Sequence, residues 1–193
     1  MDKPQSRRDL SHDRIVEAAS RAIRRSGYAG TGVADIMKEA GLTHGGFYAH
    51  FESRDALLAE AVTRAGIDSA ALVERRAQNR TKGESALRAV IEGYLSDVHF
   101  ASAETGCVVS ALSSEIPRQA PEVREASAAR VLALIDRVRK SLPESAAPDD
   151  AGVIASTMVG ALQLARAIGN EKQARALLKA VRTALLNQYD TQP

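Results

Sequence analysis

The sequence predicts an all-α protein in which a small N-terminal unit of three helices is joined by a long helix to a larger C-terminal bundle. Apolar residues recur at helical spacing along most of the chain, and no alternating strand pattern or internal repeat stands out. Alanine is abundant, there are 6 prolines among 193 residues, and aromatic residues make up 4% of the chain. This composition favours closely packed helices over sheets, and the length is ample for a buried core.

The chain opens with a polar segment and one amphipathic helix. Residues 1–10 are polar, and we expect them to form a mobile basic arm. Ser11 is the predicted N-cap of the first helix. Ile15, Ala18 and their neighbours form its apolar stripe, and Gly27 is placed to end it.

Two short helices joined by a tight turn follow. Thr31 is the predicted N-cap of the first, Gly41 permits the turn, and Thr43 can cap a helix through about Ala49. This arrangement is typical of a helix-turn-helix, whose second helix enters the DNA major groove. We therefore predict a DNA-binding domain over residues 11–53, with its phenylalanines pointing inward.

The remainder, residues 54–193, is predicted to be a helical bundle. Ser53 can cap the long helix that joins it to the first domain, and a connection is expected near residues 79–83. Pro121 is well placed to start a later helix. A loop is expected over residues 143–150, and Gly169-Asn170 should separate the last two helices.

Charge and cysteine content narrow the class of protein. The formal net charge is +2, but residues 1–30 hold seven Lys and Arg against four Asp and Glu, a local excess of three positive charges. This excess suits contact with phosphates, although a solvated charged face is the alternative. The single cysteine excludes an intramolecular disulfide. With no apolar run of membrane-spanning length and no N-terminal signal pattern, we expect a cytoplasmic protein without a membrane partner.

Motifs of catalysis are missing from the sequence. We find no cluster with metal-ligand spacing, no phosphate-binding glycine loop and no supported Ser-His-Asp arrangement. The sequence therefore predicts no enzyme activity, no metal and no cofactor. A helical protein-interaction module that does not bind DNA remains as an alternative of another class.

Several short patterns occur in a fixed order between Arg14 and Val62. The first part carries Ile15-Val16-x-Ala18-Ala19, then Gly27-Tyr28, Asp35-Ile36 and Ala40-Gly41-Leu42-Thr43. The most specific part is Gly45-Gly46-Phe47-Tyr48-Ala49-His50-Phe51, with Arg54, Leu57 and Leu58 downstream. This order and spacing resembles the TetR family of bacterial one-component repressors. The segment from Gly106 to Glu115 is similar to one found in some subgroups of that family.

The resemblance implies a dimeric repressor that a small-molecule inducer releases from a near-palindromic DNA operator, although activator action is also possible. Residues 54–193 would then form the ligand-binding and dimerisation domain. The resemblance implies that the last two helices of each subunit pack into a four-helix interface. Gly160, Ala161 and Ala165 would allow close approach there. The alternative is that these helices only cover the core of their own chain.

The resemblance and the chemistry of the residues together give a candidate DNA-binding face. Helix N-termini offer free N–H groups to phosphates, hydroxyls add donors, and glycines permit close approach. His44 is the candidate for contacting a base edge. The assigned residues are Thr31, Thr43, His44, Gly45, Gly46, Tyr48, His50 and Arg54. Four of these residues have a plainer alternative: Thr31, Thr43 and His50 as helix caps, and Tyr48 as a partly buried core aromatic.

This face departs from the family's common pattern at three positions. The family often has Ser or Thr where this chain has Gly32, and many members have Lys where this chain has His44. Arg54 replaces a frequent Lys, and either can meet a phosphate. Arg7 and Arg8 on the expected arm are placed to enter an adjacent minor groove, although an unengaged tail fits equally well.

The candidate inducer pocket lies between helices of the bundle. Because no charged cluster marks it, we expect a small, mostly apolar inducer. The candidate lining residues, all equally suited to a core, are Tyr94, Val98, Phe100, Cys107, Leu112, Met158 and Leu162.

Cys107 is the only thiol of the chain. It is predicted to be a small buried hydrophobe or, alternatively, a redox or electrophile sensor whose modification releases DNA. A sensor would need a lowered thiol pKa, which His99 or a helix N-terminus near Gly106 would supply.

Overall fold

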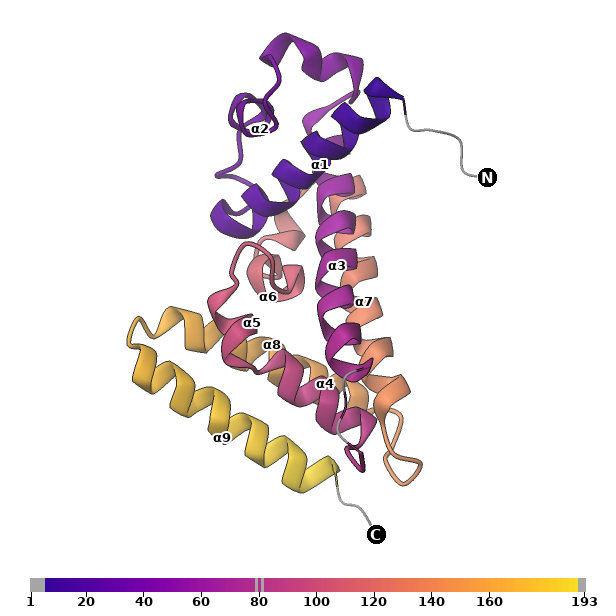
Figure 1. Cartoon of the computed structure of the whole chain (residues 1–193), viewed down its shortest axis with the longest axis vertical. Helices are drawn as coiled ribbons and strands as arrows, with labels where there is room; N and C mark the ends of the chain where they lie inside the picture. Colours follow the sequence, from indigo (N-terminus) through magenta and orange to yellow (C-terminus); the bar gives the residue numbers. More distant parts are fainter. Residues whose placement is uncertain (1–5, 79, 81, 191–193) are drawn as a thin grey trace.

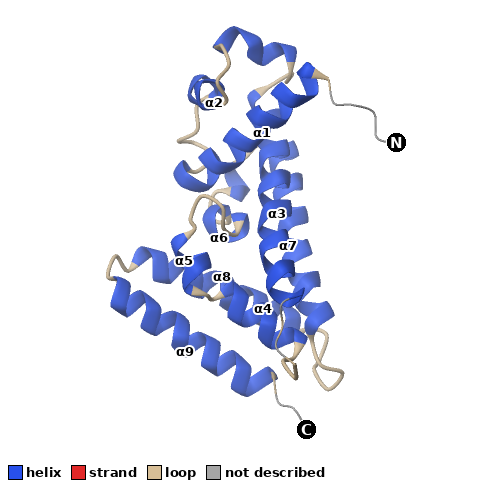
Figure 2. Ribbon diagram, in the orientation of Figure 1, coloured by secondary structure: helices blue, strands red, loops and turns tan. Residues whose placement is uncertain are grey.

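The computed structural model describes residues 6–78, 80 and 82–190, and within them only helices, turns and loops are found (Figures 1 and 2). The helices are α1 (Arg7–Ser26), α2 (Val33–Glu39), η1 (His44–Ala49), α3 (Arg54–Gln78), α4 (Ala86–Tyr94), α5 (Asp97–Ala101), α6 (Val108–Leu112), η2 (Ile116–Arg118), α7 (Pro121–Ser141), α8 (Asp150–Ala167) and α9 (Glu171–Tyr189). We call α1, α2 and η1 the head, and α3 to α9 the bundle. The predicted all-α fold, a three-helix head joined by a long helix to a bundle, is confirmed. Among these helices, none combines the length and the apolar character that crossing a membrane requires.

The first helix begins earlier than the sequence predicted. Ser6 caps α1: its hydroxyl accepts a hydrogen bond from the Asp9 N–H at 3.2 Å, and the Asp9 carboxylate accepts one from the Ser6 N–H at 3.0 Å. This reciprocal pair satisfies donors that a helix start leaves free, so the prediction that Ser11 caps the helix is wrong. Arg8, expected on a mobile arm, lies in α1 and donates to the Ala49 carbonyl at 2.8 Å. The expected arm over residues 1–10 therefore does not extend past residue 5, and residues 1–5 lie outside the described residues.

The turns of the head follow the glycines. Gly27 ends α1 with a φ of 73°, and Gly41 forms the turn after α2 with a φ of 68°, a left-handed conformation that favours glycine. Gly32 rather than Thr31 is the N-cap of α2, so that prediction is wrong.

The third helix of the head, η1, is a 3-10 helix that begins after Thr43. Its shortness and its two glycines both disfavour a regular α-helix. Thr43 occupies the N-cap position as predicted, but its side chain makes no capping hydrogen bond. The predicted cap of α3 is confirmed, because the Ser53 hydroxyl accepts from the Ala56 N–H at 2.9 Å.

Helix α3 belongs to both halves of the molecule. Its first turns bury Leu57 and Leu58 against the head, whose own core holds Phe47 and Phe51 with ring centroids 5.6 Å apart. Farther along, α3 packs along its length against α7, and Figure 1 shows the two helices side by side. One continuous helix therefore transmits the position of the head to the bundle.

The bundle is closed by a hairpin of α8 and α9. Pro121 begins α7 as predicted, α8 begins at Asp150, and Asn170 caps α9 through the Gln173 N–H at 3.1 Å. The inward face of α8 is buried, with Ile154 and Met158 fully covered. Part of the predicted connection over residues 79–83 lies outside the described residues.

A buried tyrosine ties the head to the bundle. Tyr28 is fully buried, and its hydroxyl lies 2.8 Å from the Ser127 hydroxyl on α7. Ser127 donates its own proton to the Val123 carbonyl at 2.6 Å, so Tyr28 is the donor in this pair. The Tyr28 N–H donates to the Glu115 carboxylate at 2.9 Å. The end of α1 is thus fixed to two separate segments of the bundle.

We predict that Ser127→Ala lowers the free energy of unfolding by about 1–3 kcal/mol, because it leaves the buried Tyr28 hydroxyl without a partner. Tyr28→Phe should cost less, about 1 kcal/mol, and the double variant no more than Ser127→Ala. Urea unfolding measures all three, with the exposed Ser114→Ala as control. Equal, additive losses would show that the two hydroxyls do not interact.

Candidate DNA-binding surface and ligand cavity

Helix η1 presents a polar face to solvent. Thr43, His44 and Gly45 are exposed, and Tyr48 has 76% of its surface accessible, whereas Phe47 is only 2% exposed and packs into the core of the head. The alternative that Tyr48 is a core aromatic is therefore wrong. An exposed aromatic ring beside polar groups at a helix start is typical of a contact surface.

The two glycines of η1 are not required by packing. A Cβ atom at Gly45 would meet nothing within 4 Å, and one at Gly46 would meet Met37 and Thr43 at an ordinary distance of 3.8 Å. Each glycine costs about 1 kcal/mol relative to alanine in a helix interior. The interior of the protein does not account for that cost at Gly45, whereas close approach of another molecule from outside does.

Two of the predicted surface residues have structural roles instead. Thr31 is 4% exposed, and its hydroxyl donates to the Gly27 carbonyl at 2.6 Å. Arg54 donates from Nη2 to the carbonyls of Tyr28 and Thr31, and its Nε lies 3.3 Å from the Thr31 carbonyl. The guanidinium therefore satisfies the carbonyls of the turn before α2. Because tertiary contacts occupy both groups, we correct their assignment as direct phosphate contacts.

His50 lies at the edge of this surface. Its ring is partly buried, and Nδ1 is a buried atom without a hydrogen-bond partner among the described residues. Burial lowers the pKa of His50, and the nearby His12 and Arg8 lower it further. The ring is therefore held in its neutral form, in which one nitrogen remains a donor.

The bundle contains a cavity of about 300 Å³ between α3, α7 and the segment from Tyr94 to Val109. Apolar side chains such as Val73, Val108 and Leu134 form much of its wall. Of the seven predicted lining residues, Tyr94 and Cys107 line this cavity.

The other five predicted lining residues lie elsewhere, which corrects the prediction. Val98 is 74% exposed, because the short α5 turns it to solvent. Phe100 packs against the core from outside. Leu112, Met158 and Leu162 are at most 1% exposed and belong to the core.

His99 is neutral and joins two segments of the cavity wall by hydrogen bonds. Its Nε2 accepts a hydrogen bond from the Cys107 N–H at 2.8 Å, so Nδ1 carries the proton and donates to the Tyr94 carbonyl at 2.6 Å. Burial lowers the pKa of His99. His99 therefore places no positive charge beside the Cys107 thiol at neutral pH. Cys107 itself is 5% exposed and immediately precedes α6, and its role as a sensor stays a prediction.

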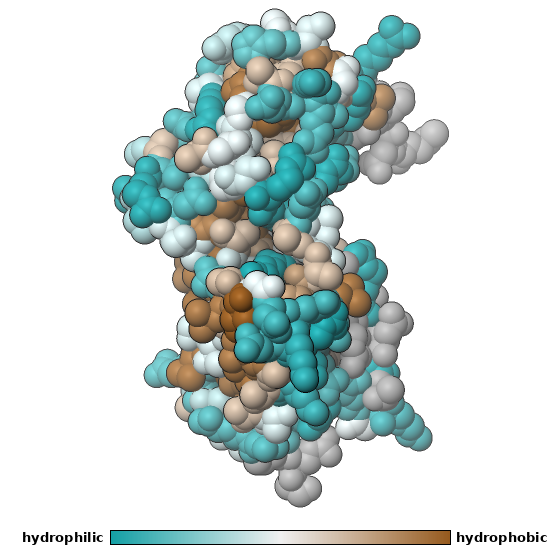
Figure 3. All heavy atoms as spheres, turned by 90° about the vertical axis from the view of Figure 1, so that its left-hand side faces the viewer, coloured by the Kyte–Doolittle hydropathy of each residue, from teal (hydrophilic) through white to brown (hydrophobic). Residues whose placement is uncertain are grey.

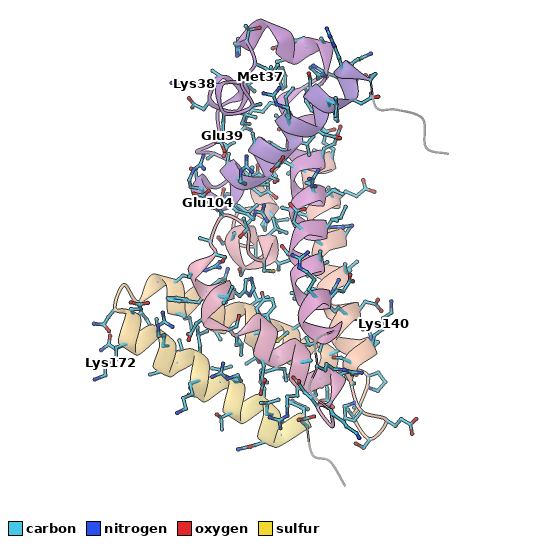
Figure 4. All side chains as sticks on the ribbon, viewed as in Figure 1. Met37, Lys38, Glu39, Glu104, Lys140 and Lys172 are labelled. Carbon is cyan, nitrogen blue, oxygen red and sulfur yellow. The ribbon has the colours of Figure 1, made fainter. Side chains whose placement is uncertain are left out.

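The wall of this cavity is hydrogen-bonded to the head. The Gly106 carbonyl accepts from Arg24 of α1 at 3.3 Å and lies 2.9 Å from the Ser69 hydroxyl of α3, which is shared with the Ala65 carbonyl at 2.6 Å. Arg24 is 6% exposed, and burial lowers its pKa. Nearby, Arg25 bridges Glu39 at 3.0 Å and Glu104 at 3.3 Å; Figure 4 shows these two carboxylates on the same side of the molecule, one on the head and one on the bundle.

Comparison with known proteins agrees with this geometry. The family model for bacterial regulatory proteins of the tetR family matches residues 15–61. The curated protein YerO of Bacillus subtilis (strain 168), described as an uncharacterized HTH-type transcriptional regulator, is 39% identical over 49 residues. The head and the first part of α3 are therefore similar to proteins of the TetR family. The match with YerO spans 25% of this chain and 17% of that relative.

Solved structures share the fold over nearly the whole chain. E. coli NemR in its reduced form has a TM-score of 0.76 over 92% of this chain and 96% of that one, at 17% identity. A TetR-family regulator from Agrobacterium tumefaciens has a TM-score of 0.76 over 94% and 98%, at 23% identity. At these identities the likeness concerns the fold alone. Since the family is one of regulatory proteins, the enzyme class is set aside.

The structure places the two residues at which the sequence departs from the TetR pattern. Gly32 caps α2 without a hydroxyl, and His44 stands exposed at the first position of η1.

The sequence analysis missed Arg24 and Glu115, which hold the head to the bundle through hydrogen bonds to groups far away in the sequence. It also missed Arg130 of α7, whose side chain lies against Gly66 of α3. Helical periodicity does not reveal such long-range contacts. Gly66, inside the long run of α3, was the one local signal, since a glycine in a helix interior often marks a close approach.

We predict that stability falls as the pH is lowered, partly because of His99. Its pKa is lowered in the folded protein, so the unfolded chain binds the proton first as the pH drops below about 6.5. This contribution is complete above that pH and is lost as the pH falls through the folded pKa. Urea unfolding between pH 7.5 and 5.5 should show a shallower dependence for His99→Asn. An unchanged dependence would mean that His99 is protonated without cost in the fold.

Proposed function

We propose that the protein is a homodimeric, ligand-responsive transcriptional repressor that binds a near-palindromic DNA operator through η1. The observation that carries this proposal is the exposed face of Thr43, His44, Gly45 and Tyr48, which contributes little to the core of the head. The match of residues 15–61 to the tetR family of regulatory proteins supports DNA binding as the use of this face.

The chemistry of η1 suits a phosphate backbone and a groove. Its first N–H groups and the unengaged Thr43 hydroxyl lie at the positive end of the helix, which attracts phosphate oxygens. Gly45 lets the backbone approach the groove closely. The exposed Tyr48 hydroxyl can donate to a phosphate, and His44 at the start of η1 is placed to reach a base edge. In this proposal the N–H groups of η1 contact phosphates and position the protein on DNA, and only a few side chains select the base sequence.

A dimer is needed because one head contacts few base pairs. The outward face of α8 is apolar and unpartnered within one chain: Val153 is 51% exposed, Leu164 61% and Ile168 40%. A Cβ atom at Gly160 on the same face would meet nothing within 4 Å. Figure 3 shows apolar surface gathered over the bundle on the side where the α8–α9 hairpin projects.

The residues proposed for close approach between subunits are therefore partly revised. Ala161 is 5% and Ala165 1% exposed within a single chain, so these two belong to its core. On α9, the exposed residues Ala176, Ala180 and Ala184 recur at every fourth position, and such small residues permit a second chain to pack closely. We propose that these outward faces of α8 and α9 form the four-helix interface.

The hydrogen bonds at Gly106 offer a route from ligand to DNA. Cys107 and Ser69 line the cavity, and the Gly106 carbonyl between cavity and head accepts from Arg24 and contacts the Ser69 hydroxyl. A ligand that displaces this wall would shift α1 and with it the spacing of the two heads. Couplings of this kind are typically about 1–3 kcal/mol, which is sufficient to change operator occupancy.

We predict sequence-specific binding to DNA from upstream of the protein's own gene, with an affinity that falls steeply as salt rises. His44→Ala and Tyr48→Phe should each weaken binding by about tenfold, since each removes one contact worth about 1–2 kcal/mol. Gly45→Ala should fold normally and still weaken binding. Mobility shifts measure this, with Tyr189→Phe as a matched control. If no promoter fragment binds, the protein-interaction module becomes the better assignment.

We predict that Leu164→Glu converts the dimer to a monomer and weakens operator binding, because it buries a charge at the interface. Leu132→Glu on α7 is the matched control, since Leu132 is also exposed, at 66%, but lies on another helix. Sedimentation measures the oligomeric state. A Leu164→Glu protein that remains dimeric would place the interface elsewhere.

A further inference from the structure

The cavity of the bundle contains polar groups that the protein leaves unsatisfied. Among the described residues, three buried side-chain polar atoms lack a hydrogen-bond partner: His50 Nδ1, Tyr94 Oη and Arg130 Nε. Two of these three, from Tyr94 and Arg130, belong to residues that line the same cavity. Since folded proteins pair nearly all buried polar groups, two such atoms in one place call for an explanation.

The Tyr94 hydroxyl is a donor held at the cavity. Tyr94 is 1% exposed, and its hydroxyl lies near Cys107 and Ser110 without hydrogen-bond geometry to either. The Ser110 hydroxyl donates to the Cys107 carbonyl at 2.9 Å and accepts from Arg166 at 3.4 Å. Burial raises the pKa of Tyr94 well above its ordinary value, so the hydroxyl keeps its proton and remains able to donate.

The position of Arg130 is built into the packing of α3 and α7. A Cβ atom at Gly66 would lie 2.3 Å from Cδ of Arg130, so only a glycine there lets the arginine side chain cross α3 as it does. A glycine inside a helix reduces helix stability. The chain therefore accepts a weaker helix at the point where Arg130 enters the cavity wall.

The charge of Arg130 is uncompensated, unlike that of the neighbouring arginine. Arg137 also lines the cavity, but it pairs with Glu74 at 3.3 Å and donates to the Ala70 carbonyl at 3.2 Å. Arg130 makes no hydrogen bond or ion pair with any described residue. His99 is neutral, as its two hydrogen bonds require. The cavity thus has mostly apolar walls, the paired Arg137 and Glu74, and one cationic group, Arg130, that lacks a counter-charge among the described residues.

We propose that the ligand of this cavity is a small organic monocarboxylate, whose carboxylate accepts hydrogen bonds from Arg130 and Tyr94 while its apolar part lies against Val108 and Leu134. A guanidinium matches a carboxylate in geometry and charge, and a single uncompensated cation selects a single anionic group. A cavity of about 300 Å³ is at the small end of ligand sites. This inference rests on the proposed ligand-responsive function and replaces a mostly apolar inducer with one that has an anionic end.

Paired probes that differ only in charge test the proposal. Binding of octanoate and 4-phenylbutyrate to the full-length protein is measured by calorimetry beside octanamide and 4-phenylbutyramide. At least one carboxylate should bind about tenfold or more tightly than its amide, as expected for a charge-assisted hydrogen bond. Arg130→Gln should remove this preference, Arg130→Lys should restore part of it, and the exposed Arg124→Gln should leave it unchanged.

Tyr94→Phe separates ligand binding from a structural role. It removes an unpartnered buried hydroxyl, so it should maintain or raise the melting temperature of the ligand-free protein while weakening carboxylate binding by several-fold. A tyrosine whose hydroxyl only stabilised the fold would lower the melting temperature on substitution.

Three results would overturn the inference: no binding of either carboxylate, equal binding of carboxylate and amide, or an Arg130→Gln protein that keeps the carboxylate preference. DNA binding without ligand is measured in parallel. If the protein and Arg130→Gln both bind the operator while carboxylates fail to bind, only the ligand assignment falls. If the wild-type protein binds no operator, the proposed function itself falls.

Discussion

The rest of the structure depends on one constraint: α1 of the head and α7 of the bundle both pack against α3. Small residues make this possible, since Ala61 and Ala65 of α3 are fully buried beside Leu57 and Leu58. Alanine at these positions lets the neighbouring helices approach closely. Because α3 is continuous from the head into the bundle, a change in the bundle that tilts α3 also moves η1, and a head without this helix would lose much of its core.

Arg24 is a buried cation where the head meets the bundle, and it makes this junction sensitive to the loss of a hydrogen-bond partner. Arg24 is nearly covered, its carboxylate neighbour Asp68 lies 3.8 Å away, and its other partners are the carbonyls of Ser20 and Gly106. A buried charge that loses one partner is costly, so the Gly106 carbonyl cannot move away from Arg24 without a response from α1. The same carbonyl adjoins Cys107 in the cavity wall. The cavity wall and the head therefore share one hydrogen-bonded peptide group.

The parts of the fold that sequence analysis could predict are those decided locally. Gly27 and Gly41 need left-handed backbone, Pro121 starts a helix, and Gly169-Asn170 interrupts one; each acts within a few residues of itself, and the structure has the corresponding turns and helix ends. The start of α1 was also local, in the pair of Ser6 and Asp9, but Ser11 offered an equally good cap, and only the structure decides between them.

The residues that sequence analysis misplaced are those whose partners lie far along the chain. Thr31 and Arg54 have the right chemistry for phosphate contact, yet the fold uses their polar groups to satisfy carbonyls between Gly27 and Thr31. Periodicity also cannot place a cavity: it identifies Met158 and Leu162 as apolar face residues, and both prove to be core. The exposed polar face of η1 was easier to predict, because its polar and small residues neither favour a helix nor suit a core.

Gly45 and Gly66 both reduce the stability of their helices, but their surroundings differ. Gly45 weakens η1 although no part of this chain needs the space, so the space faces outward. Gly66 weakens α3 because Arg130 fills the space that a side chain would occupy. Both positions reduce helix stability by about the same amount, about 1 kcal/mol, and an account of local stability alone would treat them alike. What surrounds each glycine separates them: open solvent at Gly45 supports the proposed contact with DNA, and Arg130 at Gly66, without a counter-charge among the described residues, supports the proposed anionic ligand.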